Sequence, residues 1–205
     1  MKNFFRTKSI IPVIVFNDPF EVDDKLMALY KGGLKIAEIT YRTPRSSEVL
    51  KYAIEKLGDK MTIGAGTIVS KEQAEEAISF GAKFIVSPGL SVEVAHVCEE
   101  RNIPYLPGVS SATEIMMALN LGIKTVKFFP AESLGGLKTI KALSNAFPQV
   151  KFVPTGGINE GNILTYLLDD SIASVGGSFM MKGTISDITK NTKRTLELIK
   201  LIGNK

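Results

Sequence analysis

The sequence predicts an α/β protein whose alternating strands and helices close into a (β/α)8 barrel, the TIM-barrel architecture. Short apolar or β-branched runs recur about every 20 to 25 residues with helix-like segments between them, a pattern typical of parallel strands joined by helical crossovers. Eight such units suffice to close a barrel, and 205 residues is at the short end for that fold. The alternative is a doubly wound open sheet. It calls for a Gly-x-Gly-x-x-Gly turn after the first strand, where this chain has Phe16, Asn17, Asp18 and Pro19.

A single domain accounts for the whole chain, residues 1–205. No linker rich in proline, glycine or serine divides it, and a chain of this length can bury one sizeable core. Residues 1–9 precede the first predicted strand, and we expect them to form an N-terminal extension or a short capping helix.

The strands are predicted from runs of β-branched, aromatic and other apolar residues. In chain order they cover residues 10–16, 35–40, 61–65, 84–87, 104–107, 123–129, 151–154 and 172–175. The helices between and after them cover residues 19–31, 45–57, 71–80, 91–101, 111–120, 136–146, 160–168 and 186–202.

Capping residues and glycines set the helix boundaries. Asp18 is a good N-cap for the first helix, with Pro19 in its first turn and Gly32 at its end. Ser70 is placed to cap the third helix, and Gly81 follows its last turn.

The strand over 123–129 carries the first candidate for chemistry. Strand alternation puts Thr125, Lys127 and Phe129 on one face, and Val126 and Phe128 on the other. If the second face packs on helices, Lys127 points into the space that the strands enclose. Its amine could then snorkel to solvent at the strand end, or it could be a desolvated nucleophile that attacks a carbonyl.

The second strand carries a possible partner for that lysine. Alternation aligns Glu38 and Thr40 with the interior, and Arg42 as well if the extended run continues. We expect Glu38 to lie one strand away from Lys127 and on the same face. A glutamate among apolar neighbours is costly unless it is paired or functional, so the two residues form either a catalytic pair or an ion pair that only holds the strands together.

Paired glycines follow the seventh and eighth strands. Gly156 and Gly157 follow the seventh strand, and Gly176 and Gly177 follow the eighth. In barrels the loops after these two strands frequently bind phosphate through backbone N–H groups. The alternative is a pair of tight turns that need positive φ.

Composition excludes several other kinds of site. The single histidine, His96, cannot build a histidine-rich zinc or iron site, and we expect it to be structural or on the surface. The net charge of +4 lacks a dense basic run, so it fits small anionic substrates better than nucleic acid. One cysteine, Cys98, and the absence of a long apolar run predict a cytoplasmic protein without membrane contact.

Six segments, in this order, resemble the 2-keto-3-deoxy-6-phosphogluconate (KDPG) / 4-hydroxy-2-oxoglutarate (KHG) aldolase family over almost the whole chain. The segments are Glu38-Ile-Thr-Tyr-Arg-Thr43, Gly64-Ala-Gly-Thr67, Ser87-Pro-Gly-Leu90, Lys127-Phe-Phe-Pro-Ala-Glu132, Pro154-Thr-Gly-Gly-Ile158 and Gly176-Gly-Ser178. The resemblance implies a class I aldolase on a (β/α)8 barrel, without metal or cofactor, that acts on a small 2-keto acid sugar phosphate. It also implies a homotrimer.

The same resemblance implies a role for each matching residue. Lys127 would form the Schiff base and Glu38 would be the acid/base. The substrate-binding residues would be Arg42 and Thr67 at the pyruvyl carboxylate, Pro88 and Phe129 at the pocket wall, Thr155 beside the hydroxylated segment, and Gly156, Gly157, Gly177 and Ser178 at the phosphate.

The residues themselves support the same chemistry. An imine on Lys127 accepts electrons when a neighbouring carbon–carbon bond breaks, and Glu38 can move the protons. Three alternatives remain: a phosphate-binding barrel isomerase or decarboxylase with a non-covalent lysine, an aldolase specific for the galactonate epimer, and a non-catalytic barrel that binds a sugar phosphate.

Overall fold

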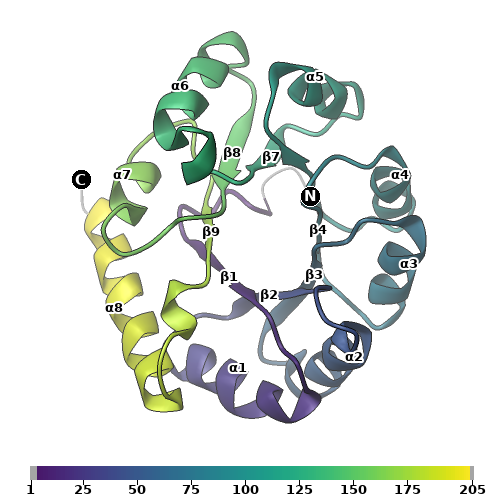
Figure 1. Ribbon diagram of the computed structural model, residues 1–205, viewed down its shortest axis with the longest axis vertical. Helices are drawn as coiled ribbons and strands as arrows, with labels where there is room; N and C mark the ends of the chain where they lie inside the picture. The colour runs from purple at the N-terminus through teal and green to yellow at the C-terminus, as the bar shows by residue number, and fades with distance from the viewer. Residues whose placement is uncertain (1–3, 204–205) are drawn as a thin grey trace.

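The computed structural model describes residues 4–203, in which parallel strands surround a common interior and helices form the outer layer (Figure 1). The strands are β1 (Ile10–Ile14), β2 (Ile36–Thr40), β3 (Thr62–Gly66), β4 (Ile85–Val86), β5 (Tyr105–Leu106), β6 (Gly108–Val109), β7 (Thr125–Phe128), β8 (Lys151–Pro154) and β9 (Val175–Gly177). The α-helices are α1 (Val22–Lys31), α2 (Ser46–Leu57), α3 (Lys71–Ser79), α4 (Val92–Glu100), α5 (Ala112–Asn120), α6 (Gly136–Ala146), α7 (Ile163–Leu167) and α8 (Ile185–Gly203). The 3-10 turns are η1 (Pro19–Glu21), η2 (Glu132–Leu134) and η3 (Phe179–Met181).

All pairings between the named strands are parallel, as the alternating pattern predicts. One sheet has the order β5-β4-β3-β2-β1-β9, and a second has the order β6-β7-β8. Between β5 and β6 lies only Pro107, which has no N–H to donate to a sheet. Two isolated parallel bridges, Phe152 with Ile172 and Thr155 with Gly176, connect the β8 side to the β9 side.

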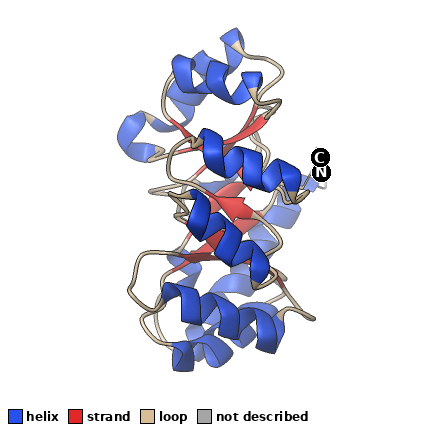
Figure 2. Ribbon diagram, turned by 90° about the vertical axis from the view of Figure 1, so that its right-hand side faces the viewer, coloured by secondary structure: helices blue, strands red, loops and turns tan. Residues whose placement is uncertain are grey.

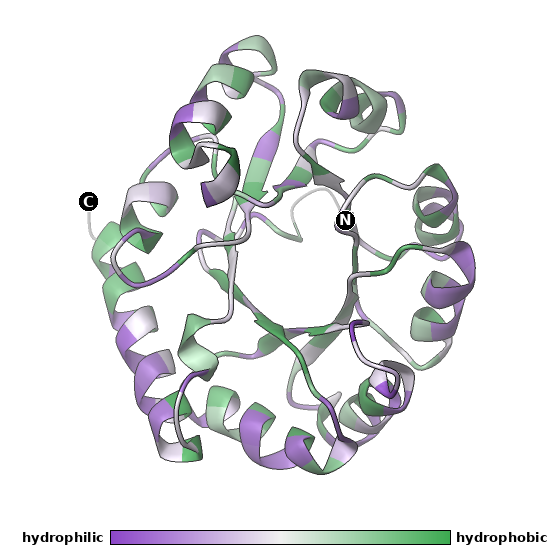
Figure 3. Cartoon of the chain, in the orientation of Figure 1, coloured by the Kyte–Doolittle hydropathy of each residue, from purple (hydrophilic) through white to green (hydrophobic). Residues whose placement is uncertain are grey.

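The strands divide the core into an inner and an outer cluster. The inner cluster is made by Phe5, Ile11, Phe84, Val86, Leu106, Val153 and Ala173. The alternate residues of the same strands, such as Ile10, Ile85 and Phe152, pack outward with the helices. Figure 2 shows the helices outside the strands, and Figure 3 shows the strands coloured mainly as hydrophobic.

The capping predictions are confirmed where they were most specific. The Asp18 side chain accepts a hydrogen bond from the Phe20 N–H, with Pro19 at the start of η1, and the Ser70 hydroxyl accepts one from the Gln73 N–H. The first predicted helix is divided into η1 and α1. At the other end of the chain α8 packs on α1, where the Thr189 hydroxyl donates to the Ala28 carbonyl at 3.2 Å.

Two predicted elements differ from the structure. The helix expected over 160–168 begins only at Ile163. The Asn159 side chain accepts a hydrogen bond from the Gly161 N–H and the Asn162 side chain accepts one from the Asn159 N–H, which makes these residues a turn. The strand expected over 172–175 lies instead at Val175–Gly177, and Ile172 forms a single bridge.

The N-terminal segment is not a helix where it is described. Residues 4–9 form turns and bends, while residues 1–3 of the expected extension lie outside the described residues. Phe5 is buried, and its ring meets the Phe84 ring edge-on at 5.8 Å between centroids. This segment therefore packs against the inner cluster.

Candidate active site

Lys127 and Glu38 are the only buried charged side chains among residues 4–203. Lys127 lies on β7 and Glu38 on β2, with side chains 2% and 3% exposed and 3.6 Å between Nζ and Oε1. Phe129 comes just after β7, and the distance from Lys127 Nζ to the centroid of its ring is 5.2 Å. The strand alternation that pointed both residues inward is confirmed.

The expected distance along the sheet between them is wrong. β2 belongs to the six-stranded sheet and β7 to the three-stranded sheet, so Glu38 is not one strand away from Lys127. The two side chains meet across the interior because the strands curve around it (Figure 1). Curvature of this kind is a property of the whole sheet and cannot be seen in either strand alone.

The geometry of the pair does not suit a purely structural ion pair. At 3.6 Å the two atoms are too far apart for a hydrogen bond, and Glu38 Oε1 has no hydrogen-bond partner among the described residues. A buried charged group without its hydrogen bonds costs free energy, so such groups occur mainly where function requires them. The arrangement favours a reactive pair.

Gly66 makes room for the Glu38 carboxylate, whereas the motif at the end of the third strand suggested only that its glycines let a ligand approach the backbone. It is paired with Thr40 at the end of β3. A β-carbon there would overlap the Glu38 carboxyl oxygen. The signal in the sequence was the glycine directly after the predicted strand, where the chain can approach another group closely.

Arg42 and Thr67 lie together, as the resemblance requires, but at the rim. The Arg42 Nε donates to the Thr67 hydroxyl at 3.0 Å. Arg42 was expected to face the interior only if the extended run continued; β2 ends at Thr40, so that condition is not met, and Arg42 is exposed. Thr67 holds a left-handed conformation at φ 58°, which turns the chain after β3.

Pro88 and Thr155 each follow the end of a strand, and each packs against a glycine of another strand. Pro88 follows β4, and its carbonyl occupies the space that a β-carbon on Gly108 would take; Gly108 is the register partner of Lys127. Thr155 follows β8 and is buried, with its side chain over Gly176.

The β8 loop has the positive φ that the tight-turn alternative expects. Gly156 and Gly157 have φ of 97° and 83°, in the left-handed region that favours glycine. The carbonyls of Thr155 and Gly156 accept from the N–H groups of Ala131 and Glu132 at 2.8 and 3.1 Å. Within the described part of the chain, no acceptor bonds the Gly157 N–H, so it is available for a ligand.

Gly177 and Ser178 are arranged differently. Gly177 ends β9 without a left-handed φ, so positive φ does not explain this glycine. A β-carbon there would lie 3.3 Å from Ile10 Cδ1 and 3.4 Å from the Phe179 ring, which leaves little room. Ser178 is exposed at the start of η3 and makes no capping bond with its side chain.

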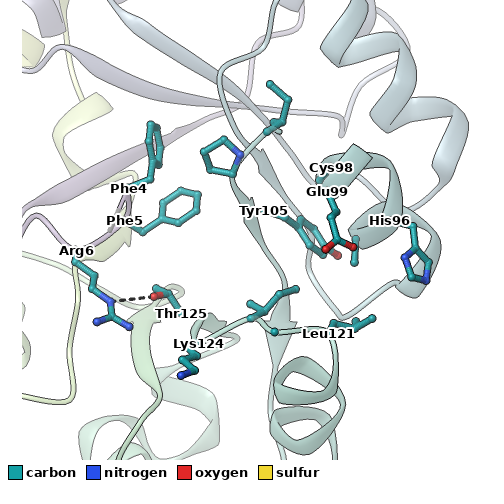
Figure 4. A pocket seen from close by; sticks show the side chains of 15 residues that line it. Phe4, Phe5, Arg6, His96, Cys98, Glu99, Tyr105, Leu121, Lys124 and Thr125 are labelled. Carbon is teal, nitrogen blue, oxygen red and sulfur yellow. Dashed lines mark hydrogen bonds between the residues drawn. The ribbon is translucent and has the colours of Figure 1, made fainter. Parts of the chain in front are cut away.

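A cavity lies away from these residues. It has a volume of about 760 Å³ and is bordered by Phe4–Arg6 residues of the N-terminal segment, by α4 and by the chain before β7 (Figure 4). His96 lines it and is exposed, which confirms the expectation that it is structural or on the surface. None of the predicted site residues borders this cavity, so it is not the candidate active site.

Two further properties concern the described residues as a whole. No three of their His, Cys, Asp and Glu side chains gather as a metal site would require. No helix formed by residues 4–203 combines the length and hydropathy needed to cross a membrane.

Comparison with known proteins gives concordant results. The family model for KDPG and KHG aldolase matches residues 1–198. A 2-dehydro-3-deoxy-phosphogluconate aldolase from Treponema pallidum is 37% identical over 196 residues, covering 93% of each chain. A KHG/KDPG aldolase from Escherichia coli is 35% identical over 206 residues, covering 98% of this chain and 96% of its own.

A solved structure is also similar to this chain. It is the KDPG aldolase from Legionella pneumophila with pyruvate captured at low pH as a covalent carbinolamine intermediate. The TM-score is 0.88 and the identity 38%, over 93% of this chain and 95% of the other.

Proposed function

Since the chain belongs to the KDPG and KHG aldolase family, we propose that it is a class I aldolase whose Schiff base forms on Lys127. Its substrates would be KDPG, cleaved to pyruvate and glyceraldehyde 3-phosphate, and 4-hydroxy-2-oxoglutarate, cleaved to pyruvate and glyoxylate. The observation that carries the proposal is the buried Lys127 amine at 3.6 Å from an otherwise unbonded Glu38 carboxyl oxygen.

The first half of the reaction builds an electron sink. The unprotonated Lys127 amine adds to the C2 carbonyl of the 2-keto acid to give a carbinolamine, which loses water to form a cationic iminium. Glu38 is the carboxyl group within reach of Nζ, so it takes the proton from the amine and returns one to the departing hydroxyl. No metal is needed, because the iminium nitrogen holds the positive charge.

The second half breaks the C3–C4 bond and then protonates C3. Removal of the C4 hydroxyl proton by Glu38 lets the C3–C4 bond break, which releases the aldehyde and leaves an enamine on Lys127. Proton return to C3 regenerates an iminium, and water then hydrolyses it to pyruvate and free lysine. The second strand supplies the only buried carboxyl group among residues 4–203, so one residue serves both proton transfers.

The remaining site residues would bind the two ends of the substrate. Arg42 and Thr67, already in contact at the rim, would hold the pyruvyl carboxylate through the planar guanidinium and the hydroxyl. Phe129 and Pro88 would line the pocket beside Lys127, and Thr155 would contact the hydroxylated segment.

We propose the phosphate site at Gly156, Gly157, Gly177 and Ser178. The free Gly157 N–H and the exposed Ser178 hydroxyl support it. Binding the phosphate there would align the bond to be cleaved with the imine, because both ends of the substrate are then held.

We also propose that the two sheets are one closed (β/α)8 barrel in a single domain. The interruption between β5 and β6 is one residue, Pro107, and the bridges of Phe152 and Thr155 connect β8 to the β9 side. The single free thiol, Cys98, is buried and is compatible with the cytoplasm, where we place the enzyme.

A homotrimer is the oligomeric state that we propose from the family resemblance. Apolar side chains at the ends of β1 and β3 and at the start of α4 support burial against another copy: Val15, Phe20, Val69 and Val92 are exposed. Phe20 is 89% exposed, which is unusual for an aromatic side chain unless another surface covers it.

The test of this function combines trapping with turnover. The protein is incubated with pyruvate and borohydride and then weighed by mass spectrometry, while cleavage of KDPG, its galactonate epimer and 4-hydroxy-2-oxoglutarate is measured separately. An aldolase gains one reduced pyruvate adduct and cleaves at least one substrate. A barrel isomerase or decarboxylase, or a non-catalytic binding protein, would give no adduct and would refute the proposal.

A further inference from the structure

We infer that Tyr166 is a positioning residue for this reaction: it holds the Glu132 carboxylate and thereby fixes the phosphate-binding form of the β8 loop. The inference rests on the proposed function, because it concerns the phosphate end of the same substrate. Neither residue was assigned a role from its place in the sequence, although Glu132 ends the lysine motif.

Glu132 joins the lysine strand to the glycine loop. Its backbone N–H donates to the Gly156 carbonyl at 3.1 Å. Its side chain lies against Gly157 so closely that a β-carbon on the glycine would be 2.6 Å from the glutamate Cβ. The segment that follows Lys127 therefore forms one wall of the proposed phosphate site.

Tyr166 holds that glutamate from the other side. It is a buried residue of α7, and its hydroxyl donates to Glu132 Oε1. Burial raises the pKa of the Tyr166 phenol, and the bond and charge of Glu132 raise it further, so the phenol keeps its proton and remains the donor. The carboxylate is thereby directed toward α7.

The backbone carbonyls of the loop are held by protein groups, which leaves one backbone N–H without an acceptor. The Gly157 carbonyl accepts from the side-chain amides of Asn159 and Asn162 at 3.1 and 3.0 Å. The carbonyls of residues 155–157 are thus all engaged with protein groups, whereas the Gly157 N–H has no acceptor among the described residues. Glu132 and the two asparagines together keep that N–H available for an anion.

The hydrogen bond from Tyr166 also limits repulsion between the Glu132 carboxylate and the phosphate. A free carboxylate beside Gly157 would repel a dianionic phosphate, because like charges at close range raise the free energy of the bound state. Donation from Tyr166 both holds the carboxylate toward α7 and spreads part of its charge. Loss of the phenol should therefore harm the phosphorylated substrate selectively.

The decisive comparison is Tyr166→Phe on two substrates. We expect kcat/KM for KDPG to fall about tenfold or more, mainly through KM, since a hydrogen bond to a charged group is lost. Cleavage of 4-hydroxy-2-oxoglutarate and borohydride trapping with pyruvate should stay within about twofold of wild type, because they do not use the phosphate loop. Equal losses on both substrates, or no loss on either, would overturn the inference.

A second variant tests the role of charge. In Tyr166→Phe/Glu132→Gln the repelling carboxylate is gone, so kcat/KM for KDPG should recover part of its loss, and failure to recover would overturn the role given to Glu132. Tyr52→Phe is the matched control, because Tyr52 also bonds a carboxylate, that of Asp23 at 3.1 Å, on the outside of the helical layer. It should leave both substrates unchanged, and thermal melting monitors the fold of every variant.

The wild-type protein separates the two proposals. If wild type neither cleaves KDPG nor traps pyruvate, the proposed function fails and the inference falls with it. If wild type is active and Tyr166→Phe shows no selective loss, only the inference fails.

Discussion

At the scale of single residues, the site buries two oppositely charged side chains that do not form a hydrogen bond with each other. Lys127 and Glu38 are both removed from water, yet their facing atoms are 3.6 Å apart. This separation leaves each group able to exchange a proton with a substrate atom that lies beside them.

Replacement of Lys127 should abolish both cleavage and trapping. Alanine removes the amine, and arginine keeps a charge but stays protonated and cannot form an imine. Mass spectrometry after borohydride reduction measures the adduct. Lys124→Ala is the control, because Lys124 is exposed just before the same strand and should leave the adduct intact. An adduct on the Lys127→Ala protein would place the nucleophile elsewhere.

Replacement of Glu38 with glutamine should separate imine formation from turnover. The amide keeps the size of the side chain but cannot transfer a proton, so kcat should fall by about 10²–10⁴ while slow trapping persists. Single-turnover and steady-state rates on KDPG measure the difference. A wild-type kcat in Glu38→Gln would reduce the residue to a structural ion pair.

At the scale of elements, the ends of the strands position the site through close backbone approach. Gly66 at the end of β3 leaves room for the Glu38 side chain, and Gly108 at the start of β6 leaves room for the Pro88 carbonyl. The first contact joins the neighbouring strands β2 and β3, and the second joins the end of β4 to β6 in the other sheet. A change in one strand therefore displaces a group on another.

Gly66→Ala should therefore inactivate the enzyme through Glu38. The new methyl group occupies the place of the carboxyl oxygen, and we expect kcat to fall by about as much as in Glu38→Gln, about 10²-fold or more. Circular dichroism and steady-state kinetics measure fold and rate. Gly89→Ala is the matched control, since a β-carbon at this nearby strand-end glycine meets no atom within 4 Å. Full activity in Gly66→Ala would show that Glu38 can relocate without loss.

At the scale of the whole molecule, two features rest on distant parts of the chain. Curvature of the strands brings β2 and β7 to the same interior, and packing of α8 on α1 joins the two ends of the helical layer. The exposed apolar side chains near the strand ends are not covered by residues 4–203, and we propose that another copy of the chain covers them.

The mass of the protein in solution tests the proposed homotrimer. Light scattering at micromolar concentration should give a mass near three times 22.3 kDa. Phe20→Asp should shift the protein toward smaller species, because a charge in an apolar interface is costly. Leu201→Asp is the control, because it changes an exposed leucine on α8 and should leave the mass unchanged. Phe147→Asp would not serve, because Phe147, after α6, is partly buried. A stable monomer of 22.3 kDa for the wild-type protein would contradict the trimer.

The sequence by itself determined the alternation of strands and helices, the inward direction of Lys127 and Glu38, and the left-handed glycines after β8. These features depend on local periodicity and on backbone preference, which a short segment already contains. Only the tertiary structure decided that Glu38 reaches Lys127 across the interior, that Arg42 lies at the rim, and that Tyr166 holds Glu132. Those contacts join residues far apart in the chain, and strand curvature and helix packing bring them together rather than the character of any one segment.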